Sequence, residues 1–204
     1  MHREPEVQKN ILYIHGFNSS PLSTKAEQAR KYFHQHYPDI NFVCPQLATS
    51  PDDVLRQLEG VLDSAIAQRW YLIGSSLGGY FSHYLSCKYQ LPAVLINPAI
   101  KPYDLLEEYI GEQTNPYTKI VYQVTEQHMY ALKAIEQSAP TFNDIQKNNY
   151  LVMVQTGDEV LDYQQAADKF QHSHLIVEQG GDHSFIDFEK KLPLIADFLQ
   201  LNLS

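Results

Sequence analysis

The sequence predicts an α/β fold, a doubly wound and mainly parallel sheet with helices on both faces. Short apolar runs alternate with stretches whose apolar residues recur at helical spacing. Each run is apolar throughout, which is typical of strands that are buried on both faces of a sheet. The chain has 204 residues, 44% of them hydrophobic, so we expect one domain over 1–204 with a substantial core.

Six apolar runs are the predicted strands. Parallel strands need crossover connections, and the segments between these runs are long enough to supply helices. In chain order the predicted strands are Ile11–Ile14, Ile40–Cys44, Trp70–Ile73, Ala93–Ile96, Tyr150–Gln155 and His174–Glu178.

Two helices carry clear start signals. Thr24-x-x-Glu27 has the spacing of a capping box and predicts a helix that extends to about His36. Ser50 precedes a proline at the first helical position and two aspartates, which predicts a second helix from Pro51.

Two further helices follow from apolar periodicity. Apolar residues recur at helical spacing after Leu77, directly behind the third predicted strand. The same spacing covers 188–199, where Pro193 should either kink the helix or mark its effective start.

The stretch at about 98–149 interrupts the alternation of strands and helices. It contains no convincing core strand, although 125–137 has a helical pattern. A span of this length between strands is usually functional, so we predict a lid inserted above the strand ends. Its tyrosines could simply pack, or they could wall a substrate pocket: Tyr103, Tyr109, Tyr117, Tyr122 and Tyr130.

Charge and composition exclude several classes of partner. The net charge of −9 disfavours nucleic acids and anionic membrane surfaces, which need a basic face. The first ten residues are too polar for a signal peptide, and no run of 18 apolar residues occurs. Cys44 and Cys87 lack metal-like spacing, so we expect reduced thiols in a cytoplasmic protein.

The segment GSSLGG, residues 74–79, predicts a nucleophilic serine. It lies between a predicted strand and an amphipathic helix, which is the setting of a nucleophile elbow. Only Ser76 has glycine at both −2 and +2, so Ser76 is the candidate nucleophile and Ser75 should point away from the cleft. Gly74 and Gly78 are expected where the strand and the helix come too close for side chains.

An acid and a base follow the last two predicted strands. Asp158 comes just after the fifth strand and His183 just after the sixth, so both should meet Ser76 at one edge of the sheet. Asp162 is a rival for the acid, because it lies only four residues further on. Asp182 is too close to His183 in sequence to orient its imidazole.

Two backbone N–H groups are the candidate oxyanion hole. The first strand ends in His15 and Gly16, and the residue after such a pair normally donates one N–H. This gives Phe17 as one donor and Leu77, the residue after the serine, as the other. We expect His15 to bond backbone near this loop and not to act as a second base.

The sequence resembles the α/β-hydrolase superfamily, and more narrowly the small bacterial esterases of the YqiA-like family. The likeness covers nearly the whole chain and is carried by YIHGFNSSP, IGSSLGGY, NPYT, QTGDEVLDY and GGDHSF. It implies a minimal α/β-hydrolase fold with a helical lid, and hydrolysis of a small-molecule acyl ester or thioester. Ser76, Asp158 and His183 match the family's triad, whereas Asp182 stands where many relatives have an uncharged residue.

Other functions stay open at this point. The same fold serves peptidases, carbon–carbon hydrolases and cofactor-free perhydrolases, and a binding protein could keep the fold without turnover. No cofactor or metal is implied. The closely spaced pairs His34 and His36, and His172 and His174, lack the further ligands of a metal site and are expected at the surface.

Overall fold

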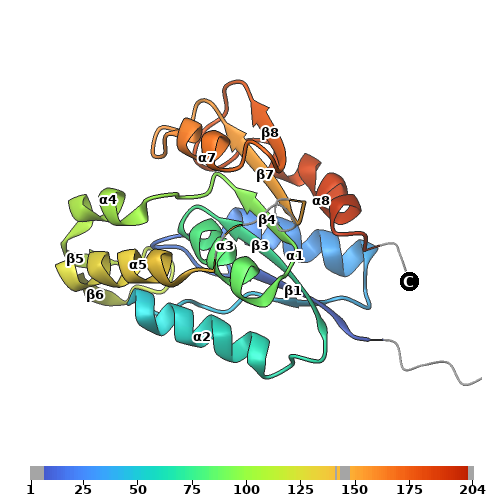
Figure 1. The fold of residues 1–204 in the computed structure, drawn as a ribbon, viewed down its shortest axis with the longest axis horizontal. Coiled ribbons are helices and arrows are strands. Elements are labelled where there is room, and N and C mark those ends of the chain that lie inside the picture. Colours follow the sequence, from blue (N-terminus) through green and yellow to red (C-terminus); the bar gives the residue numbers. More distant parts are fainter. Residues whose placement is uncertain (1–6, 141, 143–147, 202–204) are drawn as a thin grey trace, which may run out of the picture.

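The computed structural model describes residues 7–140, 142 and 148–201 (Figure 1). Its centre is a sheet of six parallel strands in the order β2-β1-β3-β4-β7-β8. The strands are β1 (Lys9–Ile14), β2 (Asn41–Val43), β3 (Arg69–Ser75), β4 (Ala93–Ile96), β7 (Tyr150–Gln155) and β8 (His174–Glu178). The predicted fold class is confirmed, and so are all six predicted strands.

Helices cover both faces of this sheet (Figure 1). They are α1 (Thr24–His36), α2 (Pro51–Asp63), α3 (Leu77–Tyr89), α7 (Tyr163–Lys169) and α8 (Leu192–Phe198), while α5 (Glu126–Ser138) packs against α2 and α4 (Pro102–Leu106). Successive side chains of β1 point to opposite faces of the sheet. Ile11 and Tyr13 join the core beneath α1 and α8, whereas Leu12 and Ile14 join the core beneath α2 and α3. Burial of both faces explains the uninterrupted apolar runs of the sequence.

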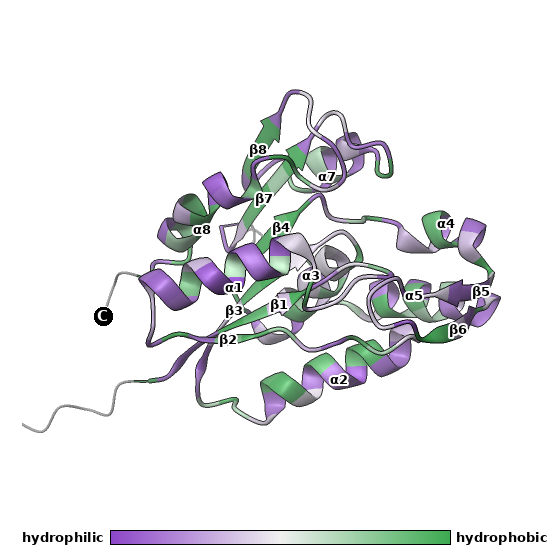
Figure 2. Ribbon diagram, turned by 180° about the vertical axis from the view of Figure 1, so that it is seen from behind, coloured by the Kyte–Doolittle hydropathy of each residue, from purple (hydrophilic) through white to green (hydrophobic). Residues whose placement is uncertain are grey.

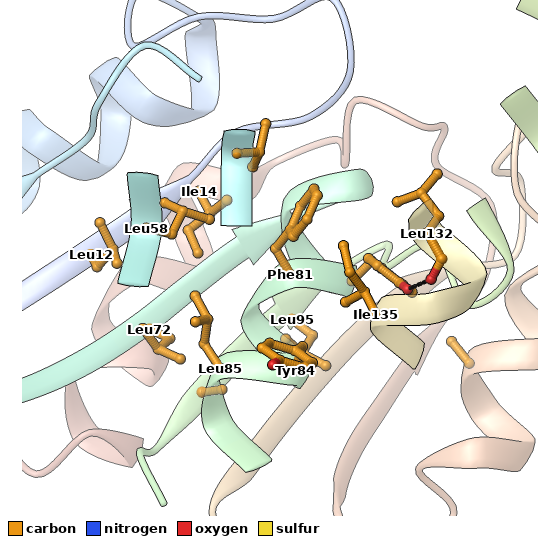
Figure 3. Close-up of a cluster of buried hydrophobic side chains, with 14 of the residues drawn as sticks. Leu12, Ile14, Leu58, Leu72, Phe81, Tyr84, Leu85, Leu95, Leu132 and Ile135 are labelled. Atoms are coloured by element: carbon orange, nitrogen blue, oxygen red, sulfur yellow. Dashed lines mark hydrogen bonds between the residues drawn. The ribbon is translucent and has the colours of Figure 1, made fainter. Parts of the chain in front are cut away.

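The hydropathy of the ribbon follows this layering. In Figure 2 the strands β3, β4 and β7 are mostly green, while α1 and α2 alternate between green and purple along their length. Figure 3 shows the core on the α3 side of the sheet. There Phe81, Tyr84 and Leu85 of α3 lie in one apolar cluster with Leu72 of β3 and Leu95 of β4. Burial of these apolar side chains is the main force that holds the helices on the sheet.

The described part of the stretch 98–149, which comprises 98–140, 142 and 148–149, is folded against this core. It contains α4 (Pro102–Leu106), a 3₁₀ turn (Glu107–Tyr109), β5 (Gly111–Thr114), β6 (Val121–Val124) and α5. Strands β5 and β6 form a separate antiparallel pair that the sequence did not predict. Leu132 and Ile135 of α5 are buried in the core, and the hydroxyl of Tyr80 donates to the carbonyl of Leu132 (Figure 3). That this stretch acts as a lid remains a prediction.

Two of the three predicted local helix signals are confirmed. The Ser50 hydroxyl accepts a hydrogen bond from the Asp53 N–H, and Pro193 lies in the first turn of α8 after a 3₁₀ turn over Phe188–Lys191. The proposed capping box is wrong, because α1 already begins at Thr24 and Ser23 is the N-cap.

Cys44 and Cys87, both among the described residues, are not joined in a disulfide. Within the described residues, no helix is both long and apolar enough to cross a membrane.

Candidate active site

Ser76 lies in a sharp turn between the end of β3 and the start of α3. Its backbone has φ 56° and ψ −121°, a conformation that L-residues rarely adopt and that occurs mainly where surrounding contacts enforce it. The Ser76 N–H donates to the Ile96 carbonyl at 3.1 Å, and the Ser76 carbonyl accepts from the Ala99 N–H at 3.0 Å. These bonds fix the turn to the end of β4.

Two glycines allow the turn to be this tight. A Cβ atom at Gly78 would overlap the carbonyl oxygen of Ile14 in β1, and one at Gly74 would overlap the carbonyl oxygen of Gly78. Helix α3 therefore approaches both strands at backbone distance. The clashes involve backbone atoms, which cannot swing aside as a flexible side chain could.

The structure brings Ser76, His183 and Asp158 together in one line of hydrogen bonds. His183 Nε2 lies 3.1 Å from Ser76 Oγ, and His183 Nδ1 lies 2.9 Å and 3.0 Å from the two carboxylate oxygens of Asp158. The three residues follow β3, β7 and β8, which reach the same edge of the sheet. An imidazole held this way can accept a proton from the serine while its other nitrogen stays bonded to the acid.

Asp158 is held as a carboxylate. Its side chain is only 2% exposed, and this burial disfavours the charged form. Hydrogen bonds from His183, Leu161 N–H and Val160 N–H outweigh the burial, so the pKa of the Asp158 carboxyl lies below its ordinary value. The acid is therefore ionised at neutral pH, where it can orient the imidazole.

The rival residues lie elsewhere. Asp162 is exposed and caps α7, accepting from the Gln164 N–H at 2.9 Å. The Asp182 carboxylate accepts from the Ser184 hydroxyl, whereas the imidazole of His183 bonds the carboxylate of Asp158. Ser75 is 4% exposed and borders the same cleft as Ser76, so the expectation that it lies away from the cleft is not confirmed; the histidine nevertheless bonds the hydroxyl of Ser76.

The two predicted oxyanion donors flank the serine. Among the described residues, no protein acceptor takes the N–H of Phe17 or of Leu77. His15 is buried beside this loop: its Nε2 accepts from the Leu47 N–H at 3.2 Å, so Nδ1 carries the proton and donates to the Gly16 carbonyl at 3.0 Å. Burial lowers the pKa of His15, so it stays neutral and structural.

Two hollows meet along the loop 15–19. An open cleft of about 580 Å³ contains Ser76 and His183 and is bordered by α1. A smaller cavity of about 60 Å³ lies on the other side of the loop, next to Phe17 and Leu77. Its apolar wall is formed by Leu47, Val54, Phe81, Leu106, Tyr122 and Val124.

The tyrosines of 98–149 divide between these environments. Tyr122 lines the small cavity and Tyr117 the open cleft. Tyr109 packs edge-on against Phe17, with ring centroids 5.3 Å apart. Tyr130 is 60% exposed and lines neither hollow, so of the two roles left open for these tyrosines it does not have that of a pocket wall in these two hollows. Its position on the outer face of α5 explains why, since the inner face supplies Met129 and Leu132 to the core.

Sequence reasoning missed two charged groups beside the histidine. The Lys25 ammonium, on the first turn of α1, donates to the Ser184 carbonyl at 2.9 Å. Burial lowers the pKa of Lys25 to about 8, and the nearby carboxylates of Asp158 and Asp182 oppose that shift. The Glu159 carboxylate accepts from the backbone N–H of His183 at 3.0 Å. No local pattern around Lys25 marks it in the sequence, whereas Glu159 stands directly after the predicted acid.

The histidine pairs are not assembled into a metal site. His34, His36, His172 and His174 are all exposed. In the part of the chain that the structure describes, no group of three or more His, Cys, Asp or Glu side chains is placed to hold a metal ion.

Comparison with known proteins agrees with this architecture. The sequence profile of UPF0227, described as an uncharacterised protein family, matches residues 10–200. The chain belongs to the UPF0227 family. Curated UPF0227 relatives named YcfP, from Escherichia coli O9:H4 (strain HS) and from Shigella boydii serotype 18, are each 23% identical over 195 residues, which is 94% of this chain and 99% of theirs.

Solved structures with a similar fold are α/β hydrolases. Est1E from Butyrivibrio proteoclasticus has a TM-score of 0.68 at 13% identity, covering 98% of this chain and 88% of Est1E. The mouse alpha/beta hydrolase domain-containing protein 10 has a TM-score of 0.68 at 16% identity, covering 96% and 90%. A monoglyceride lipase from Saccharomyces cerevisiae has a TM-score of 0.64 at 16% identity, covering 96% and 87%. This UPF0227 chain therefore has the α/β-hydrolase fold.

Proposed function

We propose that the protein is a serine hydrolase that cleaves carboxylic esters or thioesters through an acyl-enzyme on Ser76. The observation that carries the proposal is the unbroken line of hydrogen bonds from Ser76 Oγ through His183 to Asp158. The strained backbone of Ser76 adds support, because such strain is kept where the surroundings enforce it and is common at active sites.

The reaction follows from the positions of these groups. The Ser76 hydroxyl attacks the acyl carbon while His183 Nε2 takes its proton, and Asp158 stabilises the imidazolium that forms. The N–H groups of Phe17 and Leu77 would donate to the oxyanion. The imidazolium then protonates the leaving alcohol or thiol as the tetrahedral intermediate collapses. Water, with its proton taken by His183, releases the acid and restores the serine.

We assign the acyl group to the small cavity and the leaving group to the open cleft. The cavity adjoins both oxyanion donors and has an apolar wall, whereas the cleft contains Ser76 and His183 and opens to solvent. The names of similar folds fit an ester substrate: Est1E has been solved with ferulic acid bound, and the yeast lipase with a substrate analogue.

Labelling by a fluorophosphonate probe tests the proposal. Such probes react with an activated serine, so the intact protein should gain one adduct, located on the peptide at Ser76. Ser75→Ala is the matched control and should label as the parent does. Ser76→Ala should lose labelling and reduce ester turnover by about 10³-fold or more while the protein stays folded. An adduct on Ser75, or no adduct on the folded protein, would overturn the assignment.

A further inference from the structure

Two buried amide side chains lie beneath the loop that carries His183. Asn97 follows the end of β4 and is 2% exposed; Gln155 is the last residue of β7 and is 4% exposed. We call residues 179–187 the histidine loop. Ser76 and Asp158 are the hydrogen-bond partners of the imidazole, so neither amide belongs to the reacting groups.

Gln155 bonds the histidine loop on both sides of His183. Its Oε1 accepts from the backbone N–H of Asp182 at 3.2 Å and from that of Ile186 at 2.9 Å. Its Nε2 donates to the Ile186 carbonyl at 2.9 Å and to the carboxylate of Glu178 at 3.1 Å. All four hydrogen-bonding sites of the amide are thus used, three of them on the main chain of the loop.

The loop is shaped to receive this amide. Gly181 has φ 75°, and a Cβ atom there would overlap Oε1 of Gln155. The backbone of the loop can therefore approach the amide only because residue 181 is glycine. The Asp182 N–H that donates to Gln155 belongs to the residue directly before His183, so this bond holds the backbone next to the candidate base.

Asn97 holds the same loop from the next strand. Its Nδ2 donates to the carbonyls of Asp182 at 3.0 Å and His183 at 3.4 Å, and its Oδ1 accepts from the Gln155 N–H at 3.0 Å. The backbone of Asn97 has φ 40°, in a region where asparagine is among the most tolerant residues. The two amides therefore form one connected network between β4, β7 and the loop.

We propose that Asn97 and Gln155 are positioning residues that hold His183 in line with Ser76 and Asp158. This inference rests on the proposed function. The loop has no regular secondary structure apart from its short 3₁₀ neighbour, and one backbone bond, from the Gly157 N–H to the Gly180 carbonyl, ties it to the segment after β7. Around His183 itself, the bonds to Asn97 and Gln155 join the backbone of the loop to β4 and β7. A displacement of about 1 Å at a catalytic group can cost roughly 100-fold in rate. Loss of the network should therefore act on the rate of the chemical step and not on substrate binding.

A double-mutant comparison with His183→Ala tests this role. Gln155→Met keeps the side-chain length but removes every hydrogen bond of the amide. In the parent protein we expect kcat toward an activated aryl acetate to fall by about 10- to 100-fold, with KM changed less than about twofold. In the His183→Ala protein the same substitution should change the residual rate by less than about twofold, because there is no imidazole left to position.

Two further variants distinguish a positioning role from a general loss of stability. Asn10→Leu removes a similarly buried amide near the start of β1. Asn10 bonds Gln68 and Asn41 there, at the amino-terminal ends of the strands and away from the candidate site. The substitution should lower the melting temperature and leave kcat of the folded protein unchanged. Gln155→Glu keeps an acceptor for the two loop N–H groups but sets a carboxylate against the Ile186 carbonyl and the Glu178 carboxylate, to which the amide donated, so its kcat should also fall below that of the parent.

The outcomes separate the inference from the proposed function. If Gln155→Met lowers the rate by the same factor with and without His183, or leaves kcat intact, the positioning role is wrong while the proposed function stands. If Gln155→Met does not fold, the same comparison with Gln155→Glu decides. If His183→Ala by itself leaves ester turnover intact, the proposed function fails first.

Discussion

The size of the small cavity predicts a preference for short acyl chains. A volume of about 10–15 Å³ holds one water-sized group, so about 60 Å³ accommodates roughly four to six carbon atoms. Each buried methylene contributes about 0.8 kcal/mol, which is roughly fourfold in kcat/KM. From acetyl to butyryl the kcat/KM should therefore rise roughly 16-fold, and it should fall once the chain exceeds the cavity.

Leu106→Ala tests whether this cavity binds the acyl chain. Leu106 lies in the cavity wall and is 5% exposed, and its truncation should enlarge the cavity by about two carbon positions. The optimum on a panel of p-nitrophenyl esters, measured as kcat/KM against chain length, should move to longer chains by about that amount. Tyr130→Ala, on the exposed face of α5, is the control and should leave the profile unchanged.

Two results would refute this reasoning. A flat profile in the parent protein would show that the acyl chain does not enter an apolar cavity of limited size. An unchanged optimum in folded Leu106→Ala would show that the chain binds elsewhere.

Two further predictions concern the charged groups of the site. Asp158→Asn should lower kcat by about 10⁴-fold, because the imidazole loses the partner that fixes its tautomer. Asp162→Asn should leave kcat unchanged, because asparagine can still cap α7. Steady-state kinetics of both variants measure this, and a larger loss for Asp162→Asn would mean that the acid is misassigned. Burial lowers the pKa of Lys25 to about 8 in the folded chain, below its ordinary value of 10.5, so the unfolded chain holds more protons between these pH values. The free energy of unfolding contributed by Lys25 should therefore rise with pH across this window. Urea unfolding at several pH values isolates this contribution as the free energy of unfolding of the parent minus that of Lys25→Met, and this difference should rise with pH across the window. Lys31→Met, whose side chain is exposed, should follow the parent at every pH, and a parent-minus-Lys25→Met difference that does not change with pH would contradict the prediction.

The fold was predictable because its elements depend on local patterns. The strands of the central sheet are buried on both faces, so their runs are apolar without interruption, and the run Tyr150–Gln155 has the same bounds in the structure. The hairpin of β5 and β6 was missed because β5, GEQT, is polar and half exposed. Its residues adopt the strand conformation because they pair with β6, and no local pattern within β5 predicts this pairing.

The candidate site was predictable only in part. Ser76, Asp158 and His183 could be proposed because each follows a strand, and parallel strands bring their carboxyl ends to one edge. The amides of Asn97 and Gln155 were missed, although both also stand at strand ends. Their partners are main-chain groups of the histidine loop, and a sequence does not specify which backbone atoms a polar side chain will meet.

The acyl-enzyme itself tests the central claim most directly. The protein is mixed with an excess of a slowly hydrolysed ester, quenched in acid within the first turnovers, digested and mapped by mass spectrometry. We expect the mass of the acyl group to appear on the peptide at Ser76, to accumulate with a burst of released alcohol, and to be absent from Ser76→Ala. Ester turnover that persists in Ser76→Ala, or an acyl group on any residue other than Ser76, would contradict the claim.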